Sequence, residues 1–267
     1  MIALCGCSNS SSEHKSVSVF ERVKQHGTIR CGYCIYNPGC MKDPNTGKLS
    51  GIGVDALQLV AKQNGLKVDW VEEVGWGTMI EGLQTDRYDI MATPIWPSSD
   101  REKLADFGGA LYFSPVYAYV KGGNQKLVGS NLSVMNSPKY SMASIDGATA
   151  EVIAQKDFPK IRRVSLPQLS DFSQLLLTVS TGKADVTFTE PADAALFMKH
   201  NPGAVEKVGE PVRVFSNCWM FRKGQPEFKK LIDDGIEKIT ETGELEQIVK
   251  KYEPEANILL RREPQAH

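Results

Sequence analysis

The sequence lacks a long hydrophobic run, an excess of one charge and a concentration of histidines. No segment approaches the roughly 20 consecutive apolar residues of a membrane-spanning helix. The 31 basic and 32 acidic residues nearly cancel, and no basic tract predicts a nucleic-acid partner. The four histidines are scattered along the chain, which argues against a metal site: His14, His26, His200 and His267.

The motifs of common enzyme classes are also missing. The chain has no nucleophile elbow, no HExxH helix, no phosphate-binding P-loop and no GxGxxG after a strand. Cys34 has no histidine nearby in the sequence that would serve as its base. We therefore expect a protein that is not an enzyme and that carries no cofactor or metal.

Six cysteines are present, four of them in the part expected to fold. Cys31 and Cys34 have CxxC spacing, but they lie in a strand-like run where residues three apart point to opposite faces. No second CxxC pair exists. In an exported protein, a disulfide between Cys34 and Cys40 is one interpretation, and buried free thiols are the other. The pairing of Cys218 stays open as well.

The amino terminus carries a possible export signal. The segment Leu4-Cys5-Gly6-Cys7 resembles the box that precedes processing in bacterial lipoproteins, with Cys7 as the acylated residue. The apolar run before it is shorter than in a full signal peptide, so a truncated start and an accidental match are the alternatives. In the first interpretation, residues 1–16 are a leader remnant and a serine-rich tether.

Hydrophobic periodicity predicts strands and helices in alternation, in two series. The first series comprises strands at 28–36, 66–74 and 88–96 and helices at 18–27, 53–65 and 76–87. The second comprises strands at 140–146 and 186–190 and helices at 147–158, 166–185 and 191–202. A strand at 208–224 and two amphipathic helices within 226–253 follow. Such alternation predicts an α/β fold whose ligand site lies at the carboxyl ends of the strands.

Several segments, in order, resemble one family. "GIGVDALQLVAKQNGLKVDWV" contains its characteristic acid at Asp55, and "WGTMIEGLQTDRYDIM" contains its tryptophan and Tyr-Asp pair at Trp76, Tyr88 and Asp89. "SSDREKLADF" contains its arginine at Arg101. "TGKADVTFTEPADAALF" and the segment from 222 to 252 match further on. The chain resembles the periplasmic amino-acid-binding proteins of ABC importers, solute-binding family 3, polar amino-acid type.

The resemblance implies a type II periplasmic-binding-protein fold, in which two lobes joined by two hinge strands close on a ligand. Lobe 1 would hold residues 17–117 and 216–253, and lobe 2 residues 121–210. Residues 254–267 would form a flexible tail.

The resemblance also assigns a site for a zwitterion. Arg101 matches the arginine that binds the ligand carboxylate, and Thr149 matches a threonine at a helix amino terminus that assists it. Glu190 matches the acid, more often aspartate, that binds the ammonium group. Simpler interpretations are a surface arginine, a helix cap and an acidic residue at a helix start.

Other predicted pocket residues are Tyr33, Tyr36, Trp76, Thr93 and Trp96. Pro94 and Trp96 depart from the family, which usually has glycine and a hydroxyl residue there. An aromatic pocket would accept an apolar or a cationic side chain, the latter through cation–π contact. Trp96 and Trp219 are equally interpretable as core residues.

The expected function is therefore that of an extracytoplasmic solute-binding protein. It would be periplasmic or at the cell surface, lipid-anchored and monomeric, and would deliver an amino acid or similar zwitterion to an ABC importer. One alternative is a sensing domain for a membrane signalling partner. Another is an enzyme like cyclohexadienyl dehydratase on the same fold, with Glu190 as proton donor.

Overall fold

The computed structural model describes residues 17–124, 127, 131–253 and 258–262, and its largest element is an eight-stranded mixed sheet. Its strand order is β4-β1-β5-β10-β6-β9-β7-β8. A short hairpin of β2 (Met41–Lys42) and β3 (Leu49–Ser50) stands apart. The strands of the large sheet are β1 (Thr28–Tyr33), β4 (Lys67–Glu73), β5 (Ile90–Ile95), β6 (Ala105–Lys121), β7 (Ser141–Ile145), β8 (Arg162–Leu166), β9 (Val186–Thr189) and β10 (Val205–Arg222).

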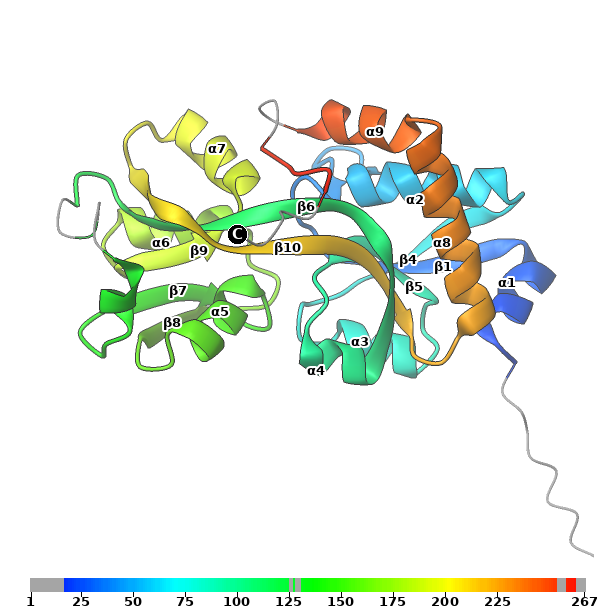
Figure 1. Cartoon of the computed structure of the whole chain (residues 1–267), viewed down its shortest axis with the longest axis horizontal. Coiled ribbons are helices and arrows are strands. Elements are labelled where there is room, and N and C mark those ends of the chain that lie inside the picture. The colour runs from blue at the N-terminus through cyan, green and yellow to red at the C-terminus, as the bar shows by residue number, and fades with distance from the viewer. Residues whose placement is uncertain (1–16, 125–126, 128–130, 254–257, 263–267) are drawn as a thin grey trace, which may run out of the picture.

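Two long strands connect the two halves of the molecule. β6 has 17 residues and β10 has 18, and they pair antiparallel along most of their length. Figure 1 shows them side by side across the middle, with separate groups of elements at either end. We call β1 to β5 with their helices lobe 1 and β7 to β9 with theirs lobe 2. The predicted two-lobed α/β fold with two connecting strands is confirmed.

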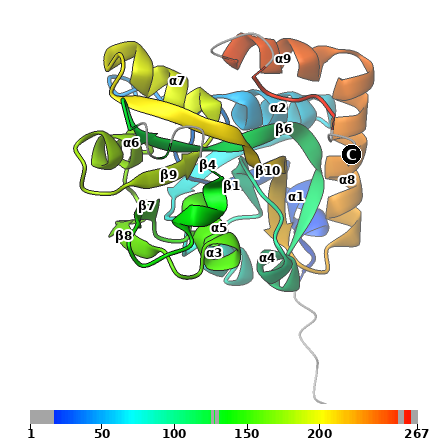
Figure 2. The same ribbon diagram turned by 60° about the vertical axis from the view of Figure 1, so that its left-hand side comes forward.

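Each lobe covers its part of the sheet with helices (Figure 2). In lobe 1, Gly235 lets α2 and α8 approach closely. A side chain at this position would place its Cβ only 2.4 Å from a Val60 methyl group. The lobe 1 helices are α1 (Val19–His26), α2 (Ile52–Gln63), α3 (Met79–Gln84), α4 (Ser99–Leu104), α8 (Pro226–Glu241) and α9 (Glu244–Tyr252). Lobe 2 contains α5 (Thr149–Asp157), α6 (Ser173–Ser180), α7 (Pro191–His200) and the 3-10 helix η1 (Leu132–Met135).

The first residues of α4 and α7 position Arg101 and Glu190, two of the predicted site residues. Ser98 caps α4 by accepting a hydrogen bond from the Arg101 amide at 3.3 Å, which fixes the backbone that carries this arginine. α7 begins with Pro191, which has no amide hydrogen and suits a first helical position. Glu190 occupies the N-cap of α7 but its side chain makes no capping bond. That carboxylate therefore stays available for another role.

Several elements differ from the sequence-based expectations. β8 was not expected, because its burial is irregular and it lacks an apolar run. The connecting strand β6 begins at Ala105, well inside the segment 17–117 that was expected to belong to lobe 1. The tail is not uniformly loose: Leu260 pairs with Phe113 of β6, and Leu259 is buried beside it. Ion pairs of Arg261 with Glu246 and Glu253 also hold this segment against α9.

The cysteines in the described residues are buried free thiols, so the predicted alternative of a Cys34–Cys40 disulfide is wrong. Burial raises the pKa of the Cys34 thiol, which keeps it protonated and unreactive. Cys7 and the rest of the leader lie outside the described residues. Within the described part of the chain, no helix is long and apolar enough to cross a membrane.

Asp89, of the Tyr-Asp pair, has a structural role in lobe 1. Its carboxylate accepts hydrogen bonds from the Arg30 amide at 2.8 Å and from Arg30 Nη2 at 2.9 Å, and it also pairs with Arg22. Asp89 is 1% exposed. Replacing Asp89 with a neutral residue would remove the carboxylate with which Arg22 and Arg30 pair.

We expect Asp89→Ala to lower the free energy of unfolding by about 3 kcal/mol, because it breaks a buried ion-pair network. The measurement is denaturant unfolding. Asp234→Ala is the matched control, since its pair with Lys230 is exposed and should change stability by less than about 0.5 kcal/mol. Equal effects of the two substitutions would contradict this role of Asp89.

Candidate ligand-binding site

Arg101 reaches from lobe 1 to lobe 2. Its Nη1 donates to the Trp96 carbonyl at 3.0 Å, and its Nη2 donates to the Gly147 carbonyl at 3.1 Å. Among the described residues it forms no salt bridge with a carboxylate. Burial lowers the pKa of its guanidinium to about 10. A desolvated cation without an acidic partner is suited to bind an anion.

The amino terminus of α5 lies beside this arginine. Gly147 accepts the Arg101 bond, and Thr149 two residues later is the partly exposed first residue of α5. The first turn of a helix offers unpaired amides and a partial positive charge. The structure therefore brings the predicted residues Arg101 and Thr149 to one place, from different lobes.

Glu190 is a buried acid without a cation. It is 1% exposed, and neither carboxylate oxygen accepts a hydrogen bond from a described residue. Burial raises the pKa of Glu190 to about 7, and the nearby polar groups of Tyr36, Ser114 and Trp96 lower it only partly. A carboxylate in this state gains strongly from a positively charged partner.

Trp96 connects the two charged groups. Its carbonyl accepts the bond from Arg101, and its indole lies close enough to Glu190 to influence that pKa. The indole Nε1 donates to Asn217 Oδ1 at 3.1 Å, and its ring stacks on Phe215 with centroids 4.0 Å apart. Trp96 is thus both packed and part of the site. Trp219, by contrast, is a core residue that donates to the Ala92 carbonyl at 3.1 Å.

The connecting strands supply polar groups that the sequence did not reveal. Asn217 of β10 donates from Nδ2 to Ser114 Oγ of β6 at 2.6 Å, and Ser114 lies near Glu190. Asn217, held in turn by Ser114, thus fixes the position of the Trp96 indole. Both residues lie inside strands with no recognisable motif around them, so no local signal marked them.

Aromatic side chains form one wall of the site. Tyr36 and Trp76 of lobe 1 contact Phe172 of lobe 2, with ring centroids 5.2 and 5.7 Å from it, and lie 5.6 Å from each other. The hydroxyls of Tyr36 and Tyr112 are buried and have no hydrogen-bond partner among the described residues. Tyr36 and Trp76 thus join the predicted pocket, and Phe172 and Tyr112 are additions from the structure.

Two predicted pocket residues have other roles. Tyr33 packs edge-on against Trp70 with centroids 6.3 Å apart, in a small cluster with Cys40. The structure therefore does not bring Tyr33 together with Tyr36 and Trp76. The Thr93 hydroxyl accepts from the Cys34 amide at 2.9 Å and donates to the Cys34 carbonyl at 2.6 Å. Thr93 therefore holds the backbone beneath the site.

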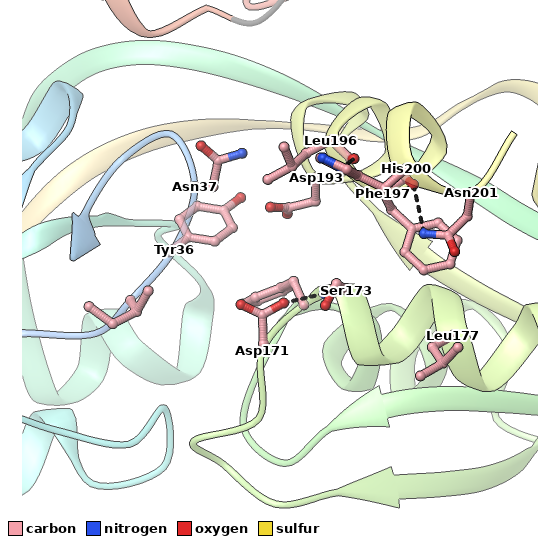
Figure 3. Close-up of a pocket in the computed structure, with 12 residues that line it drawn as sticks. Tyr36, Asn37, Asp171, Ser173, Leu177, Asp193, Leu196, Phe197, His200 and Asn201 are labelled. Carbon is pink, nitrogen blue, oxygen red and sulfur yellow. Dashed lines mark hydrogen bonds between the residues drawn. The ribbon is translucent and has the colours of Figure 1, made fainter. Parts of the chain in front are cut away.

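A cavity of about 490 Å³ opens between the lobes, and Tyr36 and Phe172 of the aromatic wall line it. Figure 3 shows Tyr36 and Asn37 facing Asp193, Asp171 and the helices of lobe 2 across it. This volume is typical of sites for small molecules. Its lining is Ile35, Tyr36, Asn37, Asp171, Phe172, Ser173, Leu177, Asp193, Leu196, Phe197, His200 and Asn201.

Residues 29–255 match the model of the bacterial extracellular solute-binding proteins, family 3. The chain belongs to this family. The match covers both lobes and the two strands between them, and the predicted family is therefore confirmed.

This chain is similar to known amino-acid-binding proteins over most of their length. The L-cystine-binding protein TcyA of Bacillus subtilis is 26% identical over 262 residues, which cover 94% of this chain and 91% of that protein. An ancestral arginine-binding protein bound to arginine has a TM-score of 0.74 at 26% identity and covers 85% of this chain and 98% of its own. An ancestral amino-acid-binding protein, a precursor of cyclohexadienyl dehydratase, has a TM-score of 0.77 at 26% identity and covers 89% and 100%.

The contact between the lobes depends on a glycine. Gly147 has a φ of +78°, and a Cβ there would lie 3.0 Å from the Gly77 amide nitrogen of lobe 1. Gln168 Oε1 of lobe 2 accepts from the same Gly77 amide at 3.1 Å. A side chain at position 147 would therefore oppose this approach of the lobes.

We expect Gly147→Ala to weaken ligand binding about tenfold or more, because overpacking of a close contact costs about 1–3 kcal/mol. Gly182→Ala is the control: Gly182 has a φ of +75° but nothing within 4 Å of its added Cβ. Titration calorimetry with the tightest amino acid from a screen measures both. Equal losses in the two variants would mean that backbone strain alone is responsible.

Proposed function

We propose that this protein captures an amino acid between its lobes and delivers it to an ABC importer outside the cytoplasm. Arg101 and the start of α5 bind the carboxylate, and Glu190 binds the ammonium group. The proposal rests on one observation: a half-buried arginine without an acid and a buried glutamate without a cation both lie near Trp96. A zwitterion supplies both missing charges.

This arrangement also links binding to closure. Arg101 belongs to lobe 1 and Glu190 to lobe 2, so one ligand must contact both lobes. Each charged group is desolvated in the closed arrangement, and the ligand compensates for that cost only there. The ligand therefore favours the closed state through its differential affinity for it.

The proposed role is binding without catalysis. The relatives described above are binding proteins, including the ancestral precursor of a dehydratase. Glu190 has the pKa of about 7 that a general acid requires, but its proposed partner is an ammonium group. The further elements of the proposal are lipidation at Cys7, a monomeric state and a division into residues 17–117 with 216–253 and residues 121–210.

Removal of the guanidinium tests the carboxylate site. In a thermal-shift screen of amino acids, a ligand that binds the native state raises the melting temperature, and Arg101→Ala should abolish that rise. Arg87→Ala is the matched control, since Arg87 pairs with Glu72 on the surface. If no amino acid shifts the wild type, or if the Arg101 variant retains the full shift, the proposed function is wrong.

The pKa of Glu190, raised to about 7, predicts the pH dependence of binding. Only the ionised carboxylate attracts the ammonium group, so affinity should be highest above pH 7. Below pH 7 it should fall by up to about tenfold per pH unit, because binding must then expel a proton.

Titration calorimetry between pH 5 and pH 8 measures this dependence. Glu190→Gln should bind weakly with a nearly flat pH profile, because the amide does not titrate. A wild-type affinity that stays constant or rises on acidification would contradict the role of Glu190.

A further inference from the structure

Asp193 is a second buried acid beside Glu190. It lies three residues further along α7 and is 7% exposed. Its Oδ2 accepts one long hydrogen bond, from Thr189 Oγ1 at 3.3 Å, and it forms no ion pair with a described residue. Burial raises the pKa of Asp193 well above its ordinary value, and the charges of Glu190 and Asp171 raise it further.

The surroundings of Asp193 are suited to a cation. Tyr36 lies across the cavity with its hydroxyl on the side of Asp193 (Figure 3), and this buried hydroxyl also lies near Glu190. Asp171 and the neighbouring aromatic residue Phe172 also line this cavity. Aromatic faces and carboxylates attract ammonium and guanidinium groups together. Among the described lining residues, no lysine or arginine neutralises these acids.

A count of charges distinguishes this cavity from the zwitterion site. The carboxylate and ammonium of an amino acid balance Arg101 and Glu190. Asp193 and Asp171 then remain as acids without a positive partner. A ligand with a neutral side chain would leave Asp193 buried and unpaired, whereas a cationic side chain would provide its partner.

We propose that the cavity around Asp193 binds the distal cationic group of an amino acid, so that the ligand carries a net positive charge. The inference rests on the proposed zwitterion site and adds the substrate class to it. A cystine-like ligand would place a second carboxylate in the cavity. That group would face Asp193 and Asp171 with only the exposed His200 as a base.

The test compares ligands of similar shape and different charge by titration calorimetry at pH 7.5. L-Arginine or L-lysine should bind at least about 30-fold more tightly than L-citrulline or L-norleucine, their neutral counterparts. L-Cystine should also bind more weakly than the cationic ligands. If a neutral amino acid or cystine binds as tightly as the cationic ones, the inference is overturned.

A substitution at Asp193 tests whether this residue causes the preference for cationic ligands. Asp193→Asn keeps the shape of the side chain and should reduce the cationic preference to less than about threefold, while citrulline binding is retained. Asp234→Asn on the surface of α8 is the matched control and should retain the full preference.

These outcomes separate the two proposals. Loss of all binding in Arg101→Ala together with no charge preference in the wild type would uphold the zwitterion site and reject the Asp193 subsite. Absence of any amino-acid binding in the wild type would reject the zwitterion site itself.

Discussion

Desolvation of two opposite charges that do not pair with each other is the constraint on which this site depends. Arg101 satisfies part of its hydrogen-bonding capacity with the carbonyls of Trp96 and Gly147, neither of which is an acid. The Glu190 carboxylate accepts no hydrogen bond from the residues that the structure describes, although polar groups of Tyr36, Ser114 and Trp96 lie near it. A direct salt bridge would stabilise both groups and close the site to a ligand. Keeping them apart preserves a place for a molecule with one charge of each sign.

The fold maintains this separation with elements from distant parts of the chain. The Trp96 indole is fixed between Phe215 and Asn217 of β10, and Asn217 is anchored to Ser114 of β6. The strands that join the lobes therefore also support the residue between the two charges. Since the ligand groups come from both lobes, opening at these strands would take Arg101 and Glu190 apart, and closing would bring them to the ligand.

Much of the architecture was accessible from sequence because local patterns specify it. Alternating strands and helices predicted the α/β fold, the resemblance to the family implied its two lobes, and the motif around Arg101 predicted the cation of the proposed site. Glu190 was accessible too, since it ends a strand and precedes Pro191, which starts a helix. The sequence did not distinguish Tyr33 from Tyr36, because the two tyrosines flank the end of one strand, and only the three-dimensional path places Tyr33 against Trp70 and Tyr36 at the cavity.

The remaining site residues depend on long-range packing. Ser114, Asn217 and Phe172 approach the ligand groups only because β6, β10 and the start of α6 converge there. Asp193 resembled an ordinary acid in the first turn of a helix, a common and stabilising placement. Its burial, which makes it unusual, depends on the tertiary structure around α7, which no local pattern reports.

A crystal structure of the protein with its tightest-binding amino acid tests the central claim most directly. The account predicts the ligand carboxylate at hydrogen-bonding distance, about 2.7–3.2 Å, from the Arg101 guanidinium and its α-ammonium at the same distance from Glu190. A ligand bound elsewhere, or one that leaves either Arg101 or Glu190 without a contact, would contradict it.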